Sequence, residues 1–159
     1  SKSRKSFNYK TLIPCNMYGK FDKYHTLQSH LMAAIIMKIH DAKLNDFPSV
    51  KIWGDGRARR EFLFVGDFAE AIWKAVKKMH LVPPIMNIGV GQDLSVKNYY
   101  EIIAKTIDWK GKFEYDLSKP VGMKRKRCSY SRQNSWGWYP KTPLMEGLRI
   151  TYDSYKDNL

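Results

Sequence analysis

Long apolar runs and closely spaced cysteines are both missing from this sequence. No stretch of about 18 consecutive apolar residues occurs, so we expect no membrane-spanning helix. The basic residues 1–5 are not followed by the apolar core of a secretory signal, which predicts a cytoplasmic protein. Cys15 and Cys128 are far apart and form no CxxC pair, which argues against a disulfide framework and against a zinc site. We therefore expect no metal centre.

Acidic residues are scarce relative to basic ones. The 159 residues include 15 Asp and Glu but 28 Lys and Arg, for a formal net charge of +13. This charge predicts an anionic partner, and nucleic acid, an acidic membrane or a phosphorylated small molecule would each fit. The chain is 43% apolar and contains five Trp, ten Tyr and seven Phe. Such a composition suffices for one domain with a packed core over residues 1–159.

A Gly-rich strand-to-helix fingerprint for a dinucleotide is also absent. The nearest candidate, residues 89–93 (GVGQD), lacks the third glycine of GxGxxG. We expect these residues to form an ordinary turn between a strand and a helix.

Strand-like and helix-like segments alternate along the chain, and this alternation predicts an α/β fold. We predict strands at residues 10–15, 50–53, 85–88 and 112–115, and a further one at the apolar run 61–65. Capping residues and helical spacing predict helices that begin at Ser29, Asp67, Ser95 and Pro143. Residues 16–28 and the basic segment 119–127 are expected to be loops.

The helix that begins at Asp67 is expected to be amphipathic. Its lysines are placed outward or near its end, where they oppose the negative pole of the helix dipole. The apolar residues predicted to face the core are Phe68, Ala71, Ile72, Ala75 and Val76.

Four segments, taken in their order and spacing, carry a family resemblance. They are residues 14–19 (PCNMYG), 60–67 (REFLFVGD), 87–91 (NIGVG, followed by Ser95-Val96) and 137–140 (GWYP). Together they are similar to the C-terminal half of extended short-chain dehydrogenases that act on nucleotide sugars. Within that superfamily the chain resembles the GDP-L-fucose synthase family most, through residues 16–19, 28–30, 53–56 (WGDG), 60–63 and 116–120 (DLSKP) and the following Arg125-Lys126.

The resemblance implies the C-terminal, substrate-binding part of an extended short-chain dehydrogenase, lacking most of the Rossmann domain. No GxxGxxG fingerprint occurs, and the resemblance implies that the family's catalytic Tyr-x-x-x-Lys helix lies in the part that precedes this segment, so we expect the N-terminal cofactor-binding domain to be absent and the isolated chain to be inactive. The implied reaction is 3,5-epimerisation and NADPH-dependent 4-keto reduction of GDP-4-keto-6-deoxymannose. Lys20, Lys38 and Ser129 replace residues that are usual in the family, so a reductase or epimerase of a GDP-heptose or another nucleotide sugar is the alternative.

His30 is the candidate catalytic residue. The matching histidine of the family lies near the nicotinamide and the sugar, and acts as an acid or base in epimerisation. The chemistry is sound because protons beside a ketone are acidic and a group that titrates near neutrality can exchange them. The resemblance also implies that Pro14, Cys15, Asn16 and Met17 line the NADP(H) and sugar site. Without the resemblance, His30 reads as a residue that bonds the backbone at a helix start, and Asn16 as a turn residue.

Lys38, Arg60 and Lys126 are the candidate ligands of the two phosphates of a GDP-sugar. Arginine binds phosphate through two parallel hydrogen bonds, whereas lysine provides a point charge. Trp53 is expected either to pack against the base or sugar or to lie in the core. The alternative for the three cations is a solvated basic surface. Further basic residues are expected to raise the local positive potential, namely Arg57, Arg59, Lys124, Arg125 and Arg127.

Two other classes of function remain open. A nucleic-acid-binding module is suggested by the charge of +13 and by the aromatic segment 136–139 (WGWY), although no helix-turn-helix, RNP or zinc pattern occurs. An interaction remnant would expose the apolar surface that packs against the absent Rossmann domain, and could self-associate. An oligomer is therefore possible, but the sequence predicts no particular dimer.

Overall fold

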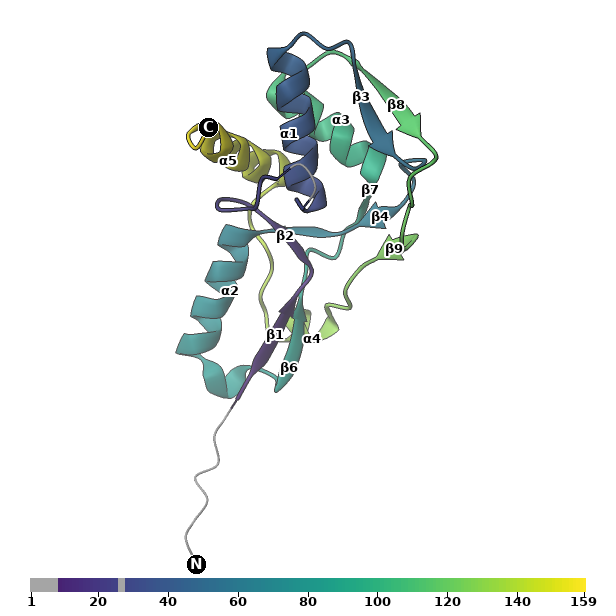
Figure 1. The fold of residues 1–159 in the computed structure, drawn as a ribbon. Helices are drawn as coiled ribbons and strands as arrows, with labels where there is room; N and C mark the ends of the chain where they lie inside the picture. Colours follow the sequence, from purple (N-terminus) through teal and green to yellow (C-terminus); the bar gives the residue numbers. More distant parts are fainter. Residues whose placement is uncertain (1–8, 26–27) are drawn as a thin grey trace, which may run out of the picture.

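The computed structural model describes residues 9–25 and 28–159, and Figure 1 shows two lobes joined by short strands across the middle. One lobe contains α1 (Leu31–Leu44), α3 (Val96–Ile107) and α5 (Leu144–Lys156) beside β3 (Ser49–Trp53) and β8 (Lys112–Asp116). The other contains α2 (Val65–Lys77), the 3₁₀ turn η1 (Met79–Leu81) and α4 (Ser131–Ser135) beside β1 (Thr11–Pro14) and β6 (Ile85–Ile88). Helices and strands are mixed in both lobes, so the α/β prediction is confirmed.

Short strands connect the lobes. β2 (Asn16–Tyr18) pairs in parallel with β5 (Phe62–Phe64). β4 (Arg59–Arg60) lies between β7 (Leu94–Ser95), to which it is antiparallel, and β9 (Arg125–Lys126), to which it is parallel. The strands within the lobes, β1 with β6 and β3 with β8, also pair in parallel. Most strand pairs are therefore parallel, as crossover helices in an α/β fold require.

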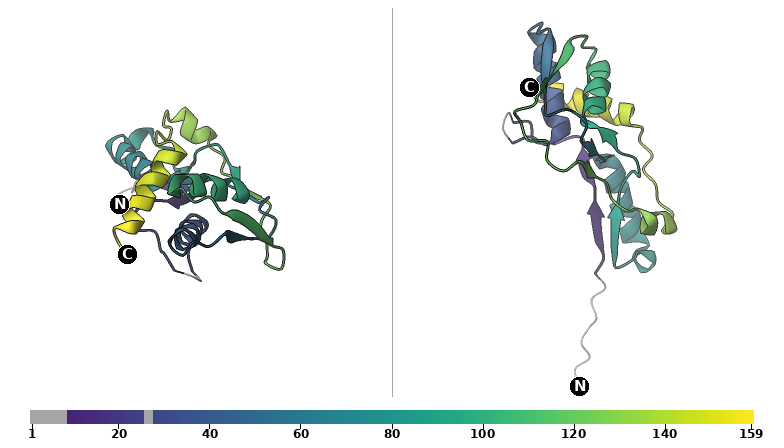
Figure 2. Two further views of the ribbon diagram at one scale, coloured as in Figure 1. Left: turned by 90° about the horizontal axis from the view of Figure 1, so that it is seen from above. Right: turned by 90° about the vertical axis from the view of Figure 1, so that its right-hand side faces the viewer.

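Each lobe has its own hydrophobic core. In the first, apolar residues repeat at helical spacing on α1 and α3 and pack together, for example Ile35, Ile39, Tyr100 and Ile103. In the second, Ala71 and Ala75 of α2 pack with residues of β6 and with Trp138. The two views of Figure 2 show α2 lying along the β1–β6 pair and α1 beside α3.

Local signals placed two of the helices correctly. The Ser95 hydroxyl accepts a hydrogen bond from the Asn98 N–H at 3.1 Å, so the predicted N-cap of α3 is confirmed. That helix ends at Asp108, whose φ of 57° is left-handed. α5 begins at Leu144, directly after Pro143, as predicted.

The predicted loops at residues 16–28 and 119–127 were partly wrong. Residues 16–18 form β2 because they find partners in residues 62–64, which are 46 positions away in register. Residues 125–126 form β9 against β4. Neither segment is apolar, so the signal for pairing was not in the local sequence.

Two predicted N-caps were also wrong. The Ser29 hydroxyl donates to the His25 carbonyl at 2.6 Å and accepts from the His25 N–H at 2.5 Å, so it closes the preceding turn, while His30 occupies the N-cap position of α1. Asp67 lies in the first turn of α2, which begins at Val65. Its carboxylate accepts from the Thr142 N–H at 3.1 Å and hydroxyl at 2.9 Å, so it ties α2 to the segment before α5.

The outer apolar residues of α2 are exposed, against the prediction. Ala71 is fully buried, but Ile72 is 43% exposed and Val76 is 57% exposed. The β1–β6 pair has only two strands, so it covers a narrow stripe of the helix.

No helix within residues 9–25 and 28–159 combines the length and apolar character needed to cross a bilayer.

Candidate functional site

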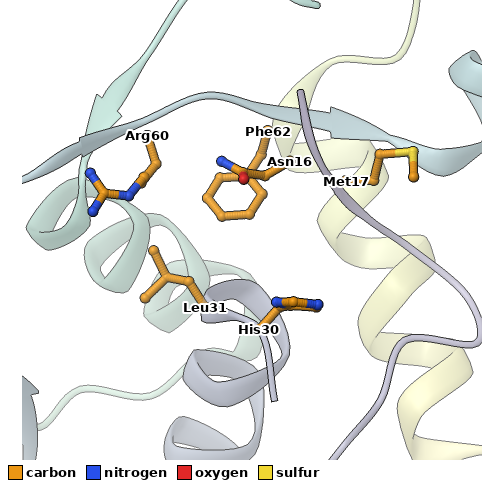
Figure 3. Close-up of a pocket in the computed structure, with 6 residues that line it drawn as sticks. All are labelled: Asn16, Met17, His30, Leu31, Arg60 and Phe62. Atoms are coloured by element: carbon orange, nitrogen blue, oxygen red, sulfur yellow. The ribbon is translucent and has the colours of Figure 1, made fainter. Parts of the chain in front are cut away.

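Two adjoining cavities lie between α1 and the middle strands. The first has a volume of about 330 Å³, and Figure 3 shows the residues that line it: Asn16, Met17, His30, Leu31, Arg60 and Phe62. The second has a volume of about 320 Å³, and Lys38, Trp53 and Tyr100 are among its lining residues. Leu31 and Arg60 line both cavities, so the two form one continuous concave site.

The first cavity brings His30 and Asn16 together. Figure 3 shows His30 and Leu31 at the start of α1, facing Asn16 and Phe62 across the space. The Asn16 amide nitrogen donates to the Glu61 carbonyl at 3.0 Å, which fixes the side chain on β2. Its amide oxygen accepts from the Lys126 ammonium at 3.3 Å. Lys126 on β9, 110 residues away from Asn16 in the chain, therefore contacts a residue that lines the first cavity, although it lines neither cavity itself.

The second cavity combines an aromatic face with cations. The Lys38 ammonium lies 4.9 Å from the centroid of the Trp53 ring, and the Lys119 ammonium lies 5.7 Å from it. Lys38 also donates to the Lys51 carbonyl at 3.3 Å and the Tyr100 hydroxyl at 3.5 Å. Burial lowers the pKa of Lys38. Trp53 is 54% exposed, so the core alternative for this tryptophan was wrong.

Arg60 is placed between the two cavities. Its Nη1 donates to the Arg59 carbonyl at 2.8 Å and the Met123 carbonyl at 2.6 Å. These two bonds hold the guanidinium, and within residues 9–25 and 28–159 the N–H groups on Nε and Nη2 have no hydrogen-bond acceptor. A planar guanidinium held in this way offers parallel donors to an anion in either cavity.

Pro14 and Cys15 are not among the residues that line these cavities. Pro14 pairs with Ile88 in the β1–β6 ladder. Cys15 is buried, and its thiol donates to the Asn16 carbonyl at 3.4 Å. Burial, with a smaller effect from Glu61, raises the pKa of the Cys15 thiol to about 12. The candidates at positions 16, 17, 30, 38, 53 and 60 line the concave site, and Lys126 contacts it through Asn16.

Glu61 was missed as a site residue, although it stands between Arg60 and Phe62. It is fully buried. One carboxylate oxygen accepts from the N–H groups of Val90 and Gly91, each at 2.7 Å, and the other accepts from the Cys128 N–H at 2.8 Å. A carboxylate inside an apolar run was the available signal, because a buried charge must be satisfied by hydrogen bonds.

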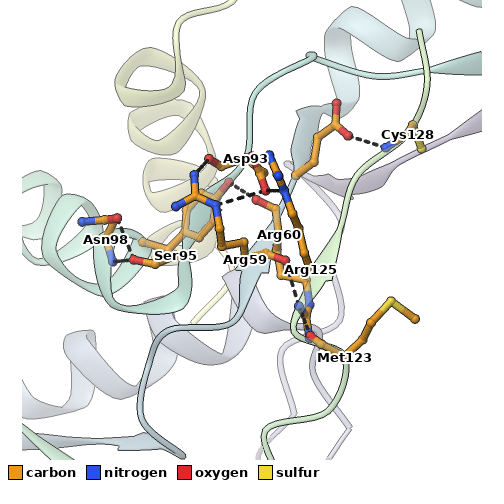
Figure 4. Close-up of polar contacts among 10 residues, drawn as sticks. Arg59, Arg60, Asp93, Ser95, Asn98, Met123, Arg125 and Cys128 are labelled. Atoms are coloured by element: carbon orange, nitrogen blue, oxygen red, sulfur yellow. Dashed lines mark hydrogen bonds and ion pairs between the residues drawn. The ribbon is translucent and has the colours of Figure 1, made fainter.

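Asp93 was also missed, and it changes the role of two basic residues. Its carboxylate is buried between Arg59 and Arg125, which donate to it from β4 and β9 (Figure 4). Arg59 and Arg125 were expected only to raise the local potential. They are instead paired, so they add less to the field at the cavities than their formal charges suggest.

In the aromatic segment at residues 136–139, Tyr139 is 56% exposed, whereas the two tryptophans take part in packing. Trp138 is only 3% exposed and belongs to the core of the second lobe. Trp136 packs against that core, with the Lys74 ammonium 4.8 Å from its ring centroid. Exposed aromatic platforms are what single-stranded nucleic acid requires, so this segment does not favour the nucleic-acid hypothesis.

The fold and the concave site together define an α/β protein with a basic, partly aromatic cleft suited to an anionic small molecule. Residues 1–89 match the model of the NAD dependent epimerase/dehydratase family. Since this match covers more than half of the chain, the chain belongs to that family.

Two similar relatives are named as synthases of GDP-sugars. A GDP-L-fucose synthase from Azorhizobium caulinodans is 51% identical over 150 residues, covering 94% of this chain and 48% of the relative. A GDP-L-colitose synthase from Yersinia pseudotuberculosis is 44% identical over 145 residues, covering 91% of this chain and 47% of the relative. The chain therefore spans about half the length of the curated relatives it matches.

A solved structure agrees with these relatives. The crystal structure of a GDP-D-glycero-L-gluco-heptose synthase from Campylobacter jejuni in the presence of NADPH superposes with a TM-score of 0.77 and 25% identity. The match covers 93% of this chain and 52% of that chain. The expected resemblance to part of an extended short-chain dehydrogenase is confirmed.

Proposed function

We propose that this chain forms the GDP-sugar-binding part of a nucleotide-sugar epimerase and reductase of the GDP-L-fucose synthase kind. The reaction would be 3,5-epimerisation and NADPH-dependent 4-keto reduction of GDP-4-keto-6-deoxymannose. The single observation that carries the proposal is the position of Arg60, which lines both cavities, with Trp53 and Lys38 on one side and His30 and Asn16 on the other.

The two cavities divide the ligand between them. The diphosphate binds at Arg60, assisted by Lys38 in the second cavity and by Lys126 beside the first, because guanidinium and ammonium groups satisfy phosphate oxygens. The nucleoside lies in the second cavity, where the exposed face of Trp53 packs against it. The sugar enters the first cavity, where Asn16 offers an amide and His30 can remove and return a proton beside the ketone.

NADP(H) supplies the hydride when it is bound. Asn16, Met17 and His30 fit the edge of a nicotinamide, because a thioether, an amide and an imidazole share one cavity and Met17 is 36% exposed there. Pro14 and Cys15 line neither cavity, and their contact with NADP(H) stays a prediction. The rest of the cofactor site belongs to a Rossmann domain. The relatives are about twice as long as this chain, which is enough for such a domain, and reduction requires it.

The exposed apolar surface of α2 supports such a partner. Ile72, Val76 and Met79 are exposed together and border a groove of about 270 Å³. The adjacent β1–β6 sheet is parallel and has only two strands, whereas parallel sheets are normally larger and covered on both faces. A Rossmann domain that extends this sheet and packs a helix against α2 would bury this surface.

A titration of this chain with GDP tests the proposal. We expect saturable quenching of Trp fluorescence with a Kd of about 1 mM or below, because Trp53 lies in the nucleoside cavity. Arg60→Ala should weaken binding by about tenfold or more, since it removes a charge-assisted contact. Arg149→Ala is the matched control, because Arg149 is exposed on α5 and lines neither cavity.

Two results would contradict the proposal. Wild-type protein that shows no saturation at up to about 10 mM GDP would remove the diphosphate site. Equal losses in the Arg60 and Arg149 variants would reduce the effect to overall charge. Tighter, steeply salt-dependent binding to a single-stranded oligonucleotide would favour the nucleic-acid alternative instead.

A further inference from the structure

The Asp93 cluster, which consists of Asp93, Arg59 and Arg125, joins three strands beside the site. The Asp93 side chain is 4% exposed and lies directly before β7. Its Oδ2 accepts from Arg125 Nε at 2.6 Å and from Arg59 Nε at 3.2 Å, and its Oδ1 accepts from Arg125 Nη2 at 2.9 Å. Arg59 Nη2 also donates to the Asp93 carbonyl at 2.5 Å. Hydrogen bonds from the two arginines hold the pKa of Asp93 well below its usual range, so the carboxylate stays charged.

The strands held by this cluster also carry two of the candidate phosphate ligands. β4 and β9 run in parallel, with Arg59 opposite Arg125 and Arg60 opposite Lys126. Successive side chains on a strand point to opposite faces. Arg59 and Arg125 therefore face Asp93, whereas Arg60 faces the two cavities and Lys126 reaches Asn16.

The backbone alone is a weak support for this arrangement. β4 and β9 have only two residues each, and an isolated ladder of that length is marginal in water. Four basic residues, Arg59, Arg60, Arg125 and Lys126, also lie opposite one another in it. Like charges directly opposite are destabilising, and the buried Asp93 carboxylate offsets this repulsion between Arg59 and Arg125.

We propose that Asp93 is a positioning residue, which holds β9 against β4 and so fixes Arg60 and Lys126 for binding a diphosphate. This inference rests on the proposed function, because it assigns the support of the same anion site. Asp93 itself lines neither cavity. Its contribution passes through Arg59 and Arg125 to the strand positions that follow them.

The sign of the effect separates positioning from simple electrostatics. Removing the charge of Asp93 makes the region more positive, so long-range attraction alone would tighten GDP binding. Loss of positioning would weaken GDP binding, because Arg60 and Lys126 would no longer be held where both can contact the phosphates. The two explanations predict opposite changes in the same measured Kd.

The test compares Asp93→Asn with Asp153→Asn in GDP titrations of this chain. Asp153 is the matched control, because it loses the same charge and a lysine partner, 2.9 Å away, on α5. We expect the Kd for GDP to rise about tenfold in Asp93→Asn and to stay unchanged in Asp153→Asn. A folded Asp93→Asn variant that binds GDP as tightly as wild type, or more tightly, overturns the proposal.

Arg125→Lys supplies a second variant that keeps the net charge. One ammonium cannot reproduce the contacts of the guanidinium with both carboxylate oxygens, so we expect a loss of affinity in the same direction. Because the Arg125 side chain is 55% exposed, this variant should fold. Unchanged affinity in Arg125→Lys would count against the proposal.

Amide hydrogen exchange tests the support without any ligand. We expect faster exchange at residues 124–126 in Asp93→Asn than in wild type or Asp153→Asn. If wild type binds no GDP, the proposed function fails, while this measurement still decides whether Asp93 holds β9. Unchanged exchange at these residues overturns the positioning role by itself.

Discussion

Replacing Glu61 by Gln should destabilise the fold strongly, although the two side chains have nearly the same shape. The carboxylate of Glu61 is fully buried and accepts three backbone N–H groups, from Val90, Gly91 and Cys128. Within residues 9–25 and 28–159 it has no ion-pair partner, so these hydrogen bonds are what satisfy the charge. Glutamine has one acceptor oxygen and would present an NH₂ group to one of the two sides.

The cost follows from those three hydrogen bonds. If the Gln oxygen keeps Val90 and Gly91, the Cys128 N–H faces another donor, and an unsatisfied buried donor costs about 1–3 kcal/mol. The two bonds that remain lose their charge assistance, for about 0.5–1 kcal/mol each. Removing a buried charge offsets part of this sum. We expect a net loss of about 2–4 kcal/mol in the free energy of unfolding, or roughly 4–16 °C in Tm for a chain of this size.

Urea and thermal unfolding followed by circular dichroism measure this loss. Glu101→Gln is the matched control, because Glu101 is 45% exposed on α3, where it pairs with Lys97 at 3.6 Å and accepts a hydrogen bond from the Asn98 amide at 3.2 Å. It should change the free energy of unfolding by less than about 0.5 kcal/mol. If Glu61→Gln and Glu101→Gln unfold alike, the three-way contact does not contribute as argued.

A second substitution probes the same contact from the opposite side. A Cβ atom on Gly89 would lie 2.6 Å from the Glu61 carboxylate, so Gly89→Ala must push this carboxylate away from its N–H partners. The effects of Glu61→Gln and Gly89→Ala should therefore not add in the double variant, since both break one arrangement. Strict additivity would mean that Gly89 and Glu61 act independently.

Two further predictions follow from the ionisation of buried groups. The pKa of Asp93 is lowered in the folded state, so its ion pairs contribute stability above the unfolded-state pKa of about 3.9, and this contribution is lost as the pH falls through the folded pKa. The difference in unfolding free energy between wild type and Asp93→Asn should thus be constant above about pH 5 and shrink on acidification; a difference that grows on acidification would reverse the assigned sign. Burial raises the pKa of Cys15 to about 12, so iodoacetamide at pH 8 should leave Cys15 unmodified in native protein and modify it in urea, as read by peptide mass spectrometry. Labelling of native Cys15 at the rate of an exposed thiol would contradict its buried state.

Much of the architecture was predictable from short-range patterns. The strands predicted at residues 85–88 and 112–115 correspond to β6 and β8, and the predicted N-cap Ser95 precedes α3. The residues chosen through family resemblance at positions 16, 30, 38, 53 and 60 line the concave site, and Lys126 contacts Asn16 there. Their roles with a ligand stay predictions, and so does the single domain over residues 1–159.

The errors have a common physical cause. Ser29 and Asp67 both have side chains suited to capping, but their oxygens bind His25 and Thr142 instead. Ile72 and Val76 have the spacing of core residues, but too little sheet lies beside α2 to cover them. In each case the choice between two acceptable environments depended on which distant segment was nearby.

The sequence by itself determined the periodic elements, the helix starts at Ser95 and Leu144, and the excess of positive charge, because these depend on neighbours within a few residues. Only the tertiary structure decided that residues 16–18 pair with 62–64, that Asp93 lies between Arg59 and Arg125, and that Arg60 borders two cavities. Such contacts join positions tens of residues apart. Which residues become partners depends on the tertiary fold of the whole chain, and local propensity does not encode that choice.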